Sequence, residues 1–351
     1  MGILSQSHVG AKPHRLLLLT ALAAFLYVAA GVALAYVAGF DHVWHAVQHP
    51  HWPWLAASLA LVALAFAGYY FAYRGIGKVE GGPDDLSHAD RLAVVAAGFG
   101  GFLAHGGTGI DRVVMRAAGG SAREAKVRVT LLGGLEHGIM AIPCSVAAMV
   151  VLVEGVRKPP LDFTIPWAVG PAVGFAVAYW AAERYRARLR RRGGWRQKLS
   201  LLFDATHLVG EMFRDPLRYG GAIAGMLLYW LGDMWALWAA LAAFGFRMNG
   251  ATLMVGFGTA MIVTRRTGPL GGAGILDLAL AATLWYCGAP WVAAVLGTFS
   301  YRFLAIWLPQ PFSFILLPRL RRLLEDSPDA DAPTSSEEDV GEQANEPALR
   351  T

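Results

Sequence analysis

Long apolar runs separated by short polar segments dominate the hydrophobic pattern of this chain. A helix needs about 20 apolar residues to cross the hydrocarbon core of a membrane. The runs of about that length are 16–38, 53–73, 129–153, 163–183, 218–246 and 290–308. We expect each to form a transmembrane helix. The pattern therefore predicts an all-α fold, a polytopic integral membrane helix bundle over residues 1–324.

Two further apolar regions are shorter and interrupted. Residues 91–108 are rich in glycine and continue into polar, helix-like sequence up to 128, while 251–287 is broken by Arg-Arg-Thr-Gly-Pro. No half of either region is long enough to cross comfortably alone. We therefore expect 91–128 and 251–287 to form broken, re-entrant units that enter and leave the membrane on one side.

The two broken units also resemble each other. Gly98-Phe99-Gly100 begins the first and Gly256-Phe257-Gly258 begins the second, and each continues into a glycine-rich stretch that ends in aspartate. With the crossings predicted above, the two units are approached from opposite sides. Similar sequence with opposite topology predicts an inverted repeat, whose site lies near the membrane midplane.

Composition and charge agree with a membrane protein. Hydrophobic residues make up 56% of the chain and charged residues only 16%, whereas soluble domains carry about 25% charged residues. The basic residues cluster at segment ends without forming a stripe, so nucleic acid is not an expected partner. The arginine-rich segment 184–198 should be cytoplasmic and the loop 40–52, which has no Lys or Arg, should be outside. We expect a multi-pass plasma-membrane protein with both termini in the cytoplasm, against which Arg157 and Lys158 are an exception.

The C-terminal segment has a different composition from the rest. From Glu325 onward the chain is acidic and rich in Pro and Ser. Such a sequence cannot bury enough apolar surface to order itself. We expect 325–351 to be a disordered cytoplasmic tail.

Metal, cofactor and catalytic signals are weak. Cys144 and Cys287 lie in apolar runs and read as packing residues. The histidines of the 40–52 loop alternate with tryptophans, which favours an interfacial belt over a zinc site lacking a complete set of ligands. We expect no metal and no cofactor, and no catalytic residue is assigned because no nucleophile or phosphate-loop motif is present.

The strongest candidate site is the glycine-rich break in the second unit. Arg265 and Arg266 can bind a phosphate or carboxylate, although arginines near helix ends also serve as headgroup anchors. Charge inside a membrane is functional by default, which favours the binding role. Gly271, Gly272 and Gly274 would let the backbone approach the ligand. Asp277 either contributes to this site or interacts with the N-terminal dipole of its own helix.

The first unit and its neighbouring span supply a second set of candidates. His105, Asp111 and Arg112 form the matching constellation, in which Asp111 and Arg112 pair with each other or with the second unit. Glu136 and His137 lie within an apolar run and are candidates for proton coupling, with a structural ion pair as the alternative for Glu136. Asp233 and Arg302, also within runs, are candidates for a mutual ion pair, which sequence alone does not decide.

These motifs resemble those of one membrane family. Gly109-Ile110-Asp111-Arg112, Leu135-Glu136-His137 and Pro269-Leu270-Gly271-Gly272-Ala273-Gly274-Ile275-Leu276-Asp277 are similar to motifs of the lysylphosphatidylglycerol synthase transmembrane region. This family is also called flippase-like and includes stand-alone YbhN-like members. The resemblance covers roughly residues 15–320. Asp stands where the family has Glu in the first and third motifs, and His137 stands where it has Arg.

The resemblance implies a flippase-like transporter without a synthase domain. We expect it to move an anionic lipid or a polyprenyl-phosphate-type amphiphile, with an anionic membrane lipid as its partner and a homo-oligomer or an envelope-synthesis enzyme as further partners. Two alternatives remain open. One is an intramembrane lipid-modifying enzyme, and the other is a non-transporting accessory subunit of a cell-envelope pathway.

Overall fold

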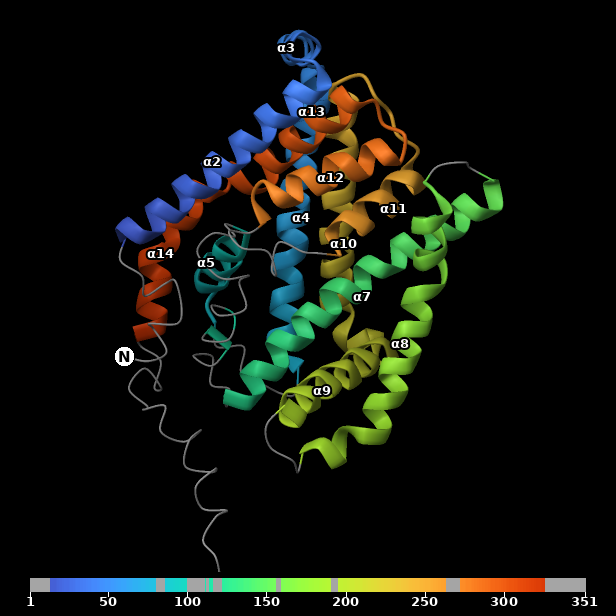
Figure 1. The fold of residues 1–351 in the computed structure, drawn as a ribbon. Helices are drawn as coiled ribbons and strands as arrows, with labels where there is room; N and C mark the ends of the chain where they lie inside the picture. Colours follow the sequence, from blue (N-terminus) through green and yellow to red (C-terminus); the bar gives the residue numbers. More distant parts are fainter. Residues whose placement is uncertain are drawn as a thin grey trace, which may run out of the picture.

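The structure, a computed structural model, is a bundle of helices of very different lengths (Figure 1). It describes residues 13–79, 86–99, 111, 114–115, 122–155, 159–190, 195–262 and 272–325, and no strand occurs among them. The helices are α2 (Pro13–Ala38), α3 (Phe40–Gln48), α4 (Trp52–Gly77), α5 (His88–Phe99), α7 (Ala122–Glu154), α8 (Leu161–Arg190), α9 (Trp195–Arg214), α10 (Pro216–Ala243), α11 (Gly250–Met261), α12 (Ile275–Tyr286), α13 (Trp291–Arg302), the π-helical segment η4 (Phe303–Trp307) and α14 (Gln310–Glu325).

Six of the described helical stretches are long and apolar enough to cross a membrane. They are Leu17–Ala38, Trp52–Gly77, Glu124–Glu154, Leu161–Leu189, Pro216–Ala243 and Trp291–Leu323. Each overlaps one of the six apolar runs of the sequence. Many large apolar side chains on these helices are exposed, among them Phe25, Val153 and Trp180, as expected where lipid takes the place of water. The predicted all-α polytopic bundle is confirmed.

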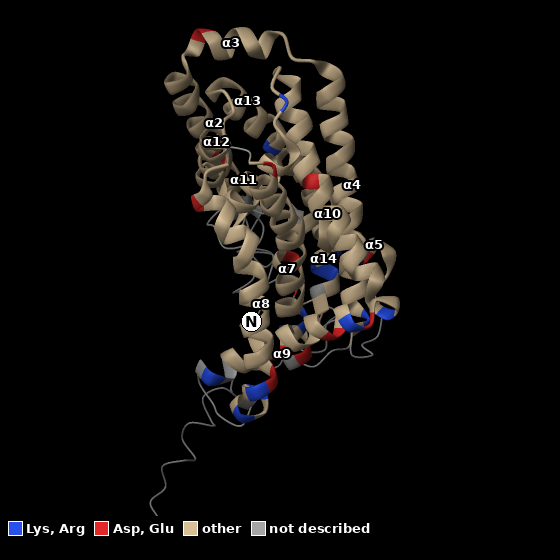
Figure 2. Ribbon diagram, turned by 90° about the vertical axis from the view of Figure 1, so that its right-hand side faces the viewer, with Lys and Arg blue, Asp and Glu red and all other residues tan. Residues whose placement is uncertain are grey.

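Charged residues divide the molecule into two ends. Lys and Arg side chains gather around α9 and the adjoining end of α8, and α3 lies at the opposite end (Figure 2). We refer to these as the basic end and the α3 end. Helix α4 runs from the α3 end to the basic end, and α10 runs back (Figure 1). A basic end of this kind is what the positive-inside rule associates with the cytoplasm, and the orientation in the cell stays a prediction.

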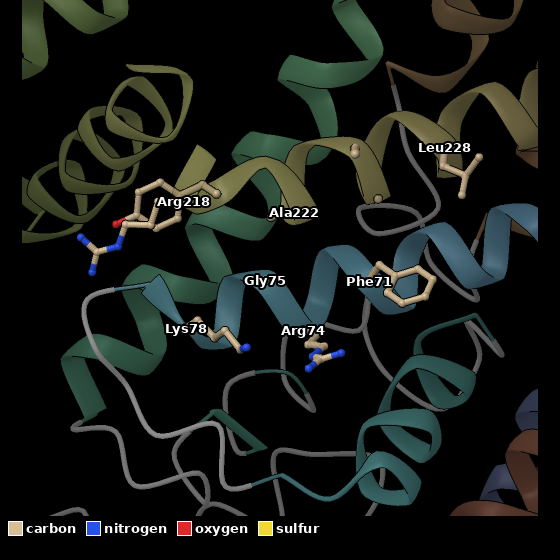
Figure 3. Close-up of a pocket in the computed structure, with 11 residues that line it drawn as sticks. Phe71, Arg74, Gly75, Lys78, Arg218, Ala222 and Leu228 are labelled. Atoms are coloured by element: carbon tan, nitrogen blue, oxygen red, sulfur yellow. The ribbon is translucent and has the colours of Figure 1, made fainter. Parts of the chain in front are cut away.

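Among the described helices, α4 and α10 pack most closely, because glycines let their backbones touch. A Cβ atom added to Gly225 would lie 2.6 Å from the backbone nitrogen of Ala72, and one added to Gly68 would lie 2.5 Å from that of Tyr229. Near the basic end, Gly75 faces Ala222 in the same way (Figure 3). Small residues at such contacts are the usual means by which membrane helices associate, since lipid offers no hydrophobic drive.

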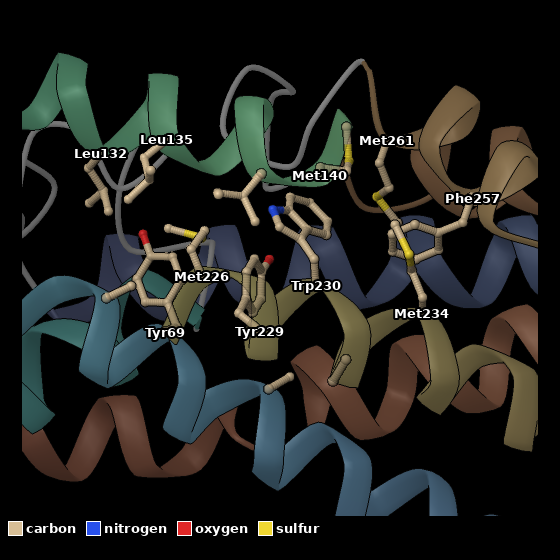
Figure 4. Close-up of a cluster of buried hydrophobic side chains, with 14 of the residues drawn as sticks. Tyr69, Leu132, Leu135, Met140, Met226, Tyr229, Trp230, Met234, Phe257 and Met261 are labelled. Carbon is tan, nitrogen blue, oxygen red and sulfur yellow. The ribbon is translucent and has the colours of Figure 1, made fainter. Parts of the chain in front are cut away.

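Large side chains fill the space between the α4–α10 pair and α7. Trp230, Tyr229 and Met226 of α10 point toward α7, with Tyr69 of α4 beside them (Figure 4). The indole Nε1 of Trp230 donates a hydrogen bond of 2.6 Å to the backbone carbonyl of Glu136. A buried tryptophan is stabilised by a partner for its N–H group, and this bond fixes α10 against the middle of α7.

Helices α11 and α12 form a hairpin of two half-length helices. Each has 12 residues, and they lie side by side (Figure 1). Both ends of the hairpin connect to elements at the α3 end, because Phe244 after α10 and Val292 at the start of α13 pack in one cluster with Val43 of α3. The unit thus starts and finishes at the same end of the bundle, which is the arrangement expected of a re-entrant unit.

The first broken unit is described only in part. Helix α5 has 12 residues and packs against α14, where the hydroxyl of Ser313 donates to the carbonyl of Ala96 at 2.7 Å. The remainder of the unit, apart from residues 111, 114 and 115, lies outside the described residues up to α7. The proposed inverted repeat therefore stays a prediction.

The last span is longer than the apolar run that predicts it. The run ends at residue 308, but the helical path continues from α13 through η4 into α14. The amide of Leu308 bonds to the carbonyl of Phe303 at 2.9 Å, five residues back, as in a π-helical turn. Pro309 and Pro311 lack N–H groups, which disfavours them in the interior of a helix. They lie between the π-helical segment and the first turn of α14, where no helical N–H group is needed.

A buried ion pair holds the glycine-rich hairpin

The glycines before α12 shape the turn that begins this helix. Gly272 and Gly274 have φ angles of 77° and 80°, a left-handed conformation that side chains with a Cβ rarely adopt. Gly274 also approaches helix α2 closely, since an added Cβ would lie 3.1 Å from the carbonyl oxygen of Leu26. The backbone conformation of the turn and its contact with α2 therefore explain why glycine stands at these two positions.

Asp277 lies in the first turn of α12 and closes the turn onto the helix. Its Oδ2 accepts a hydrogen bond of 2.9 Å from the backbone N–H of Gly274. A carboxylate at this position satisfies an N–H group that the helix cannot, and it interacts favourably with the positive end of the helix dipole. This is the structural alternative considered for Asp277 above.

The other oxygen of Asp277 binds an arginine from the neighbouring helix. Arg302 Nε lies 2.7 Å from Asp277 Oδ1, and the two side chains are only 4% and 1% exposed. A buried charge is costly unless it is paired and hydrogen-bonded. Here the guanidinium and the carboxylate neutralise and hydrogen-bond each other. Both oxygens of Asp277 are thus engaged inside the protein.

Arg302 also influences a third helix. Asp233 of α10 is 3% exposed, it hydrogen-bonds to the Tyr301 hydroxyl, and its carboxylate interacts electrostatically with Arg302. The sequence suggests Asp233 as a partner for Arg302, but the direct ion pair that the structure shows is with Asp277. One guanidinium therefore connects the hairpin helix α12, the span that starts with α13, and the central helix α10.

Glu136 of α7 lies close enough to Asp233 to interact with the group of charged residues Asp277, Arg302 and Asp233. Its side chain is 1% exposed, and its charge interacts with those of Asp233 and Asp111. Asp111, 5% exposed, is a residue of the first broken unit. Acidic side chains from both broken units and from two full spans are therefore gathered inside the bundle, where membrane proteins place ion or substrate pathways.

His137 does not share this interior position. It is exposed, and its Nδ1 lies 2.8 Å from the backbone carbonyl of Gly133 on its own helix. Successive residues of a helix point about 100° apart, so the burial of Glu136 turns His137 outward. The two candidates for proton coupling thus face different surroundings.

The other predicted site residues lie outside the described residues. They are His105, Arg112, Arg265, Arg266 and Gly271. Of the remaining candidates, the structure gathers Asp277 with Arg302 and Asp233, and it connects Asp111 with Glu136. Gly272 and Gly274 form the turn that precedes Asp277.

No family model matches this chain, and comparisons with curated proteins and with solved structures find no match either. The resemblance to the flippase-like family therefore rests on the motifs alone and stays a prediction.

The sequence contains a signal for the Asp277–Arg302 pair that was missed. Helices α12 and α13 have 12 residues each and are joined by a short turn. Asp277 lies in the first turn of one and Arg302 is the last residue of the other. Two helices of equal length that fold back on each other bring such residues together. Tyr301, next to Arg302, carried no signal because a tyrosine in an apolar run is unremarkable.

The histidines near α3 line a separate cavity at the α3 end. Its volume is about 620 Å³, and His45, His49, His51, Trp54 and Arg247 contribute to its walls. Within the part of the chain that the structure describes, no group of three His, Cys, Asp or Glu side chains is placed to hold a metal ion.

Proposed function

We propose that this protein moves an anionic amphiphile, such as a phospholipid or a polyprenyl phosphate, across the membrane. The observation that carries the proposal is the hairpin of half-length helices α11 and α12, anchored inside the bundle by the Asp277–Arg302 ion pair. Broken helices paired with buried charge are the form that substrate sites take in many transporters, because helix ends and freed backbone groups can meet a polar ligand within the membrane.

The residues that join the two half-helices supply the chemistry for an anion. The connection between Ile262 and Gly272 contains Arg265 and Arg266, two guanidinium groups in succession. Guanidinium groups bind phosphate through paired, charge-assisted hydrogen bonds. In this proposal they engage the headgroup together with Arg112 of the first unit. Asp277 and Arg302 are positioning residues that keep the return helix in place.

The motif resemblance supports the same class of cargo. The glycine-rich stretch ending in Asp277 is similar to a family motif, and so is the segment that contains Asp111 and Arg112. In this proposal the buried Glu136, whose charge interacts with that of Asp111, exchanges a proton during the cycle. The orientation that goes with this proposal has the basic end and both termini in the cytoplasm, in a plasma membrane.

Reconstitution into liposomes tests the proposal. A fluorescent phosphatidylglycerol in the inner leaflet is followed by the fraction that a membrane-impermeant quencher reaches. We expect wild-type protein to accelerate its movement, the double variant Arg265→Ala with Arg266→Ala to lose most of that acceleration, and a labelled phosphatidylcholine to move more slowly.

A matched control removes the same charge elsewhere. Arg184 and Arg188 are exposed near the end of α8, and their double substitution by alanine should leave the rate unchanged. Equal rates for the wild type and the Arg265/Arg266 variant would overturn the proposal. Mass spectrometry of the lipids after the assay separates movement from modification, because a lipid-modifying enzyme would change their mass.

A further inference from the structure

A groove at the basic end has the shape and charge to hold a lipid molecule. It lies between α4 and α10, away from the α11–α12 hairpin, and has a volume of about 580 Å³. Lys78, the residue after α4, and Arg218 of α10 line one end of it, Phe71 and Leu228 line the other, and Arg74 of α4 lies between Lys78 and Phe71 (Figure 3). One continuous hollow thus has cations along one part and apolar side chains at its far end.

The floor of the groove is formed by the close backbone contact of the two helices. Gly75 and Gly225 lie on it, and both touch the opposite helix so closely that no Cβ would fit. The missing side chains let the two helices touch, and the groove runs along this line of contact. Gly221 lies where the groove is open, since a Cβ added there would meet no atom within 4 Å.

The direction of the groove matches the direction of a lipid in a membrane. Lys78, the residue that follows α4, is seven positions after Phe71, a rise of about 10 Å in an α-helix. The headgroup layer on each side of a bilayer is about 5–8 Å thick. A phosphate beside the cations would therefore leave the first part of an acyl chain beside Phe71 and Leu228, with the cations at the end that the charge pattern assigns to the cytoplasm.

We propose that this groove binds one anionic phospholipid from the leaflet at the basic end. The phosphate lies among Arg74, Lys78 and Arg218, and an acyl chain follows the groove over Gly225 toward Leu228. Basic hollows between transmembrane helices on the cytoplasmic side bind anionic headgroups in this way. The bound lipid covers the α4–α10 contact and is a resident ligand, distinct from the cargo proposed for the hairpin.

A soluble phosphate compound could use the same cations, but it would leave the apolar half of the groove unused. Phe71 is 49% exposed. An acyl chain would pack against its ring, whereas a free phosphate would not. Each atom pair in such a contact adds a small dispersion attraction, and the sum over an acyl chain is substantial. The groove therefore favours an amphiphile.

Native mass spectrometry of the full-length protein in detergent tests the proposal by counting bound lipids. We expect the first phosphatidylglycerol to bind the wild type at least about tenfold more tightly than phosphatidylcholine. Arg74→Ala with Arg218→Ala should lose that preference. Gly221→Leu should weaken binding at least about tenfold without any change in charge, because the leucine would occupy the open part of the groove.

Two controls are matched to these variants. Gly220 is next to Gly221, an added Cβ there also meets no atom within 4 Å, and it does not line the groove, so Gly220→Leu should bind as the wild type does. Arg184→Ala with Arg188→Ala removes two charges from the same end and should also leave binding unchanged. Unaltered affinity in both groove variants would overturn the proposal.

Competition separates the lipid from a soluble phosphate. Inorganic phosphate or glycerol 3-phosphate at millimolar concentration should not displace the bound phosphatidylglycerol, and displacement would overturn the lipid assignment. The result does not depend on the transport proposal, because the assay involves no movement across a membrane. The Arg265→Ala, Arg266→Ala variant, which tests transport, should retain this binding.

Discussion

Arg302 holds the first turn of α12 through Asp277, with Nε and Oδ1 2.7 Å apart in the interior of the bundle. The pair joins the last residue of α13 to the helix that follows the glycine turn, so the position of the hairpin depends on it. Removing one member of a buried ion pair leaves an uncompensated charge.

We expect Asp277→Asn and Arg302→Met each to destabilise the protein by about 3–5 kcal/mol, the usual cost of breaking a buried pair. Removing both charges together should cost less than the sum, since no charge is then left alone. Thermal unfolding in detergent measures this. Asp162, an exposed acid in the first turn of α8, provides the control, because Asp162→Asn should shift the midpoint only slightly. Strict additivity of the two substitutions would argue against the pair.

The α4–α10 contact predicts opposite effects for two glycines of the same helix. Gly225→Val should prevent stable folding, because its Cβ would lie 2.6 Å from the backbone nitrogen of Ala72. Gly221→Ala should be neutral or stabilising by up to about 1 kcal/mol, since alanine is the better helix former and has open space there. Yield and thermal midpoint in detergent distinguish the two. Equal behaviour of both variants would contradict the described contact.

Acid should weaken the contact between α5 and α14. Partial burial raises the pKa of Asp90, but hydrogen bonds from Arg319 and Ser87 outweigh it and lower the pKa below its usual value, with Arg319 Nε 2.6 Å from Asp90 Oδ1. A lowered folded-state pKa contributes stability that is present above the unfolded value, about 3.9, and is lost as the pH falls through the folded value. Wild type should exceed Asp90→Asn in thermal midpoint at pH 7, and the difference should shrink as the pH falls below about 4 and vanish only below the folded-state pKa. A constant difference would contradict this.

Glu136 and His137 should differ in their effect on transport. If the buried Glu136 exchanges a proton, Glu136→Gln removes the pH dependence of lipid movement in liposomes, because glutamine cannot titrate. His137 is exposed on the same helix, and His137→Gln should leave the pH profile unchanged. The rate of lipid movement is measured between pH 5.5 and pH 8 for each variant. An unchanged profile for Glu136→Gln would remove this residue from the mechanism.

Cysteine labelling checks the orientation. The native cysteines, Cys144 and Cys287, form no disulfide and are buried, so their background labelling should be low. Asp41 of α3 and Arg188 near the end of α8 are exposed and lie at the two ends of the bundle. A membrane-impermeant maleimide should label Asp41→Cys in intact cells and Arg188→Cys only after permeabilisation. The reverse pattern would invert the proposed topology.

The spans could be predicted from the sequence because each must present an apolar surface over its whole length. Trp52–Gly77 is recognisable for this reason alone. The partner of Arg302 could not be read in the same way, because hydropathy does not distinguish Asp233 from Asp277. Only the equal lengths of α12 and α13, which fold back on each other, favour Asp277. Sequence patterns report how one helix meets lipid, whereas ion pairs depend on where two helices meet.

The end of the last span shows a second limit. Pro309 and Pro311 favour a helix stop, and the apolar run indeed ends there. The structure continues into α14 because the π-helical turn before Pro309 changes the hydrogen-bond pattern, and the fixed φ of proline suits the start of the next helix. The apolar run therefore ends at residue 308, whereas the helical path continues into α14.

The π-helical segment Phe303–Trp307 also sets the angular phase of everything that follows it. One extra residue in a helical turn rotates the later side chains by about 100° relative to an uninterrupted α-helix. Ser313 and Arg319 reach Ala96 and Asp90 of α5 with this offset in place. Deleting one residue between Arg302 and Leu308 would turn both side chains away from α5 while leaving Arg302 at Asp277. The segment therefore changes the direction in which the side chains point. Because of this change, one continuous span contacts α12 through Arg302 and α5 through Ser313 and Arg319.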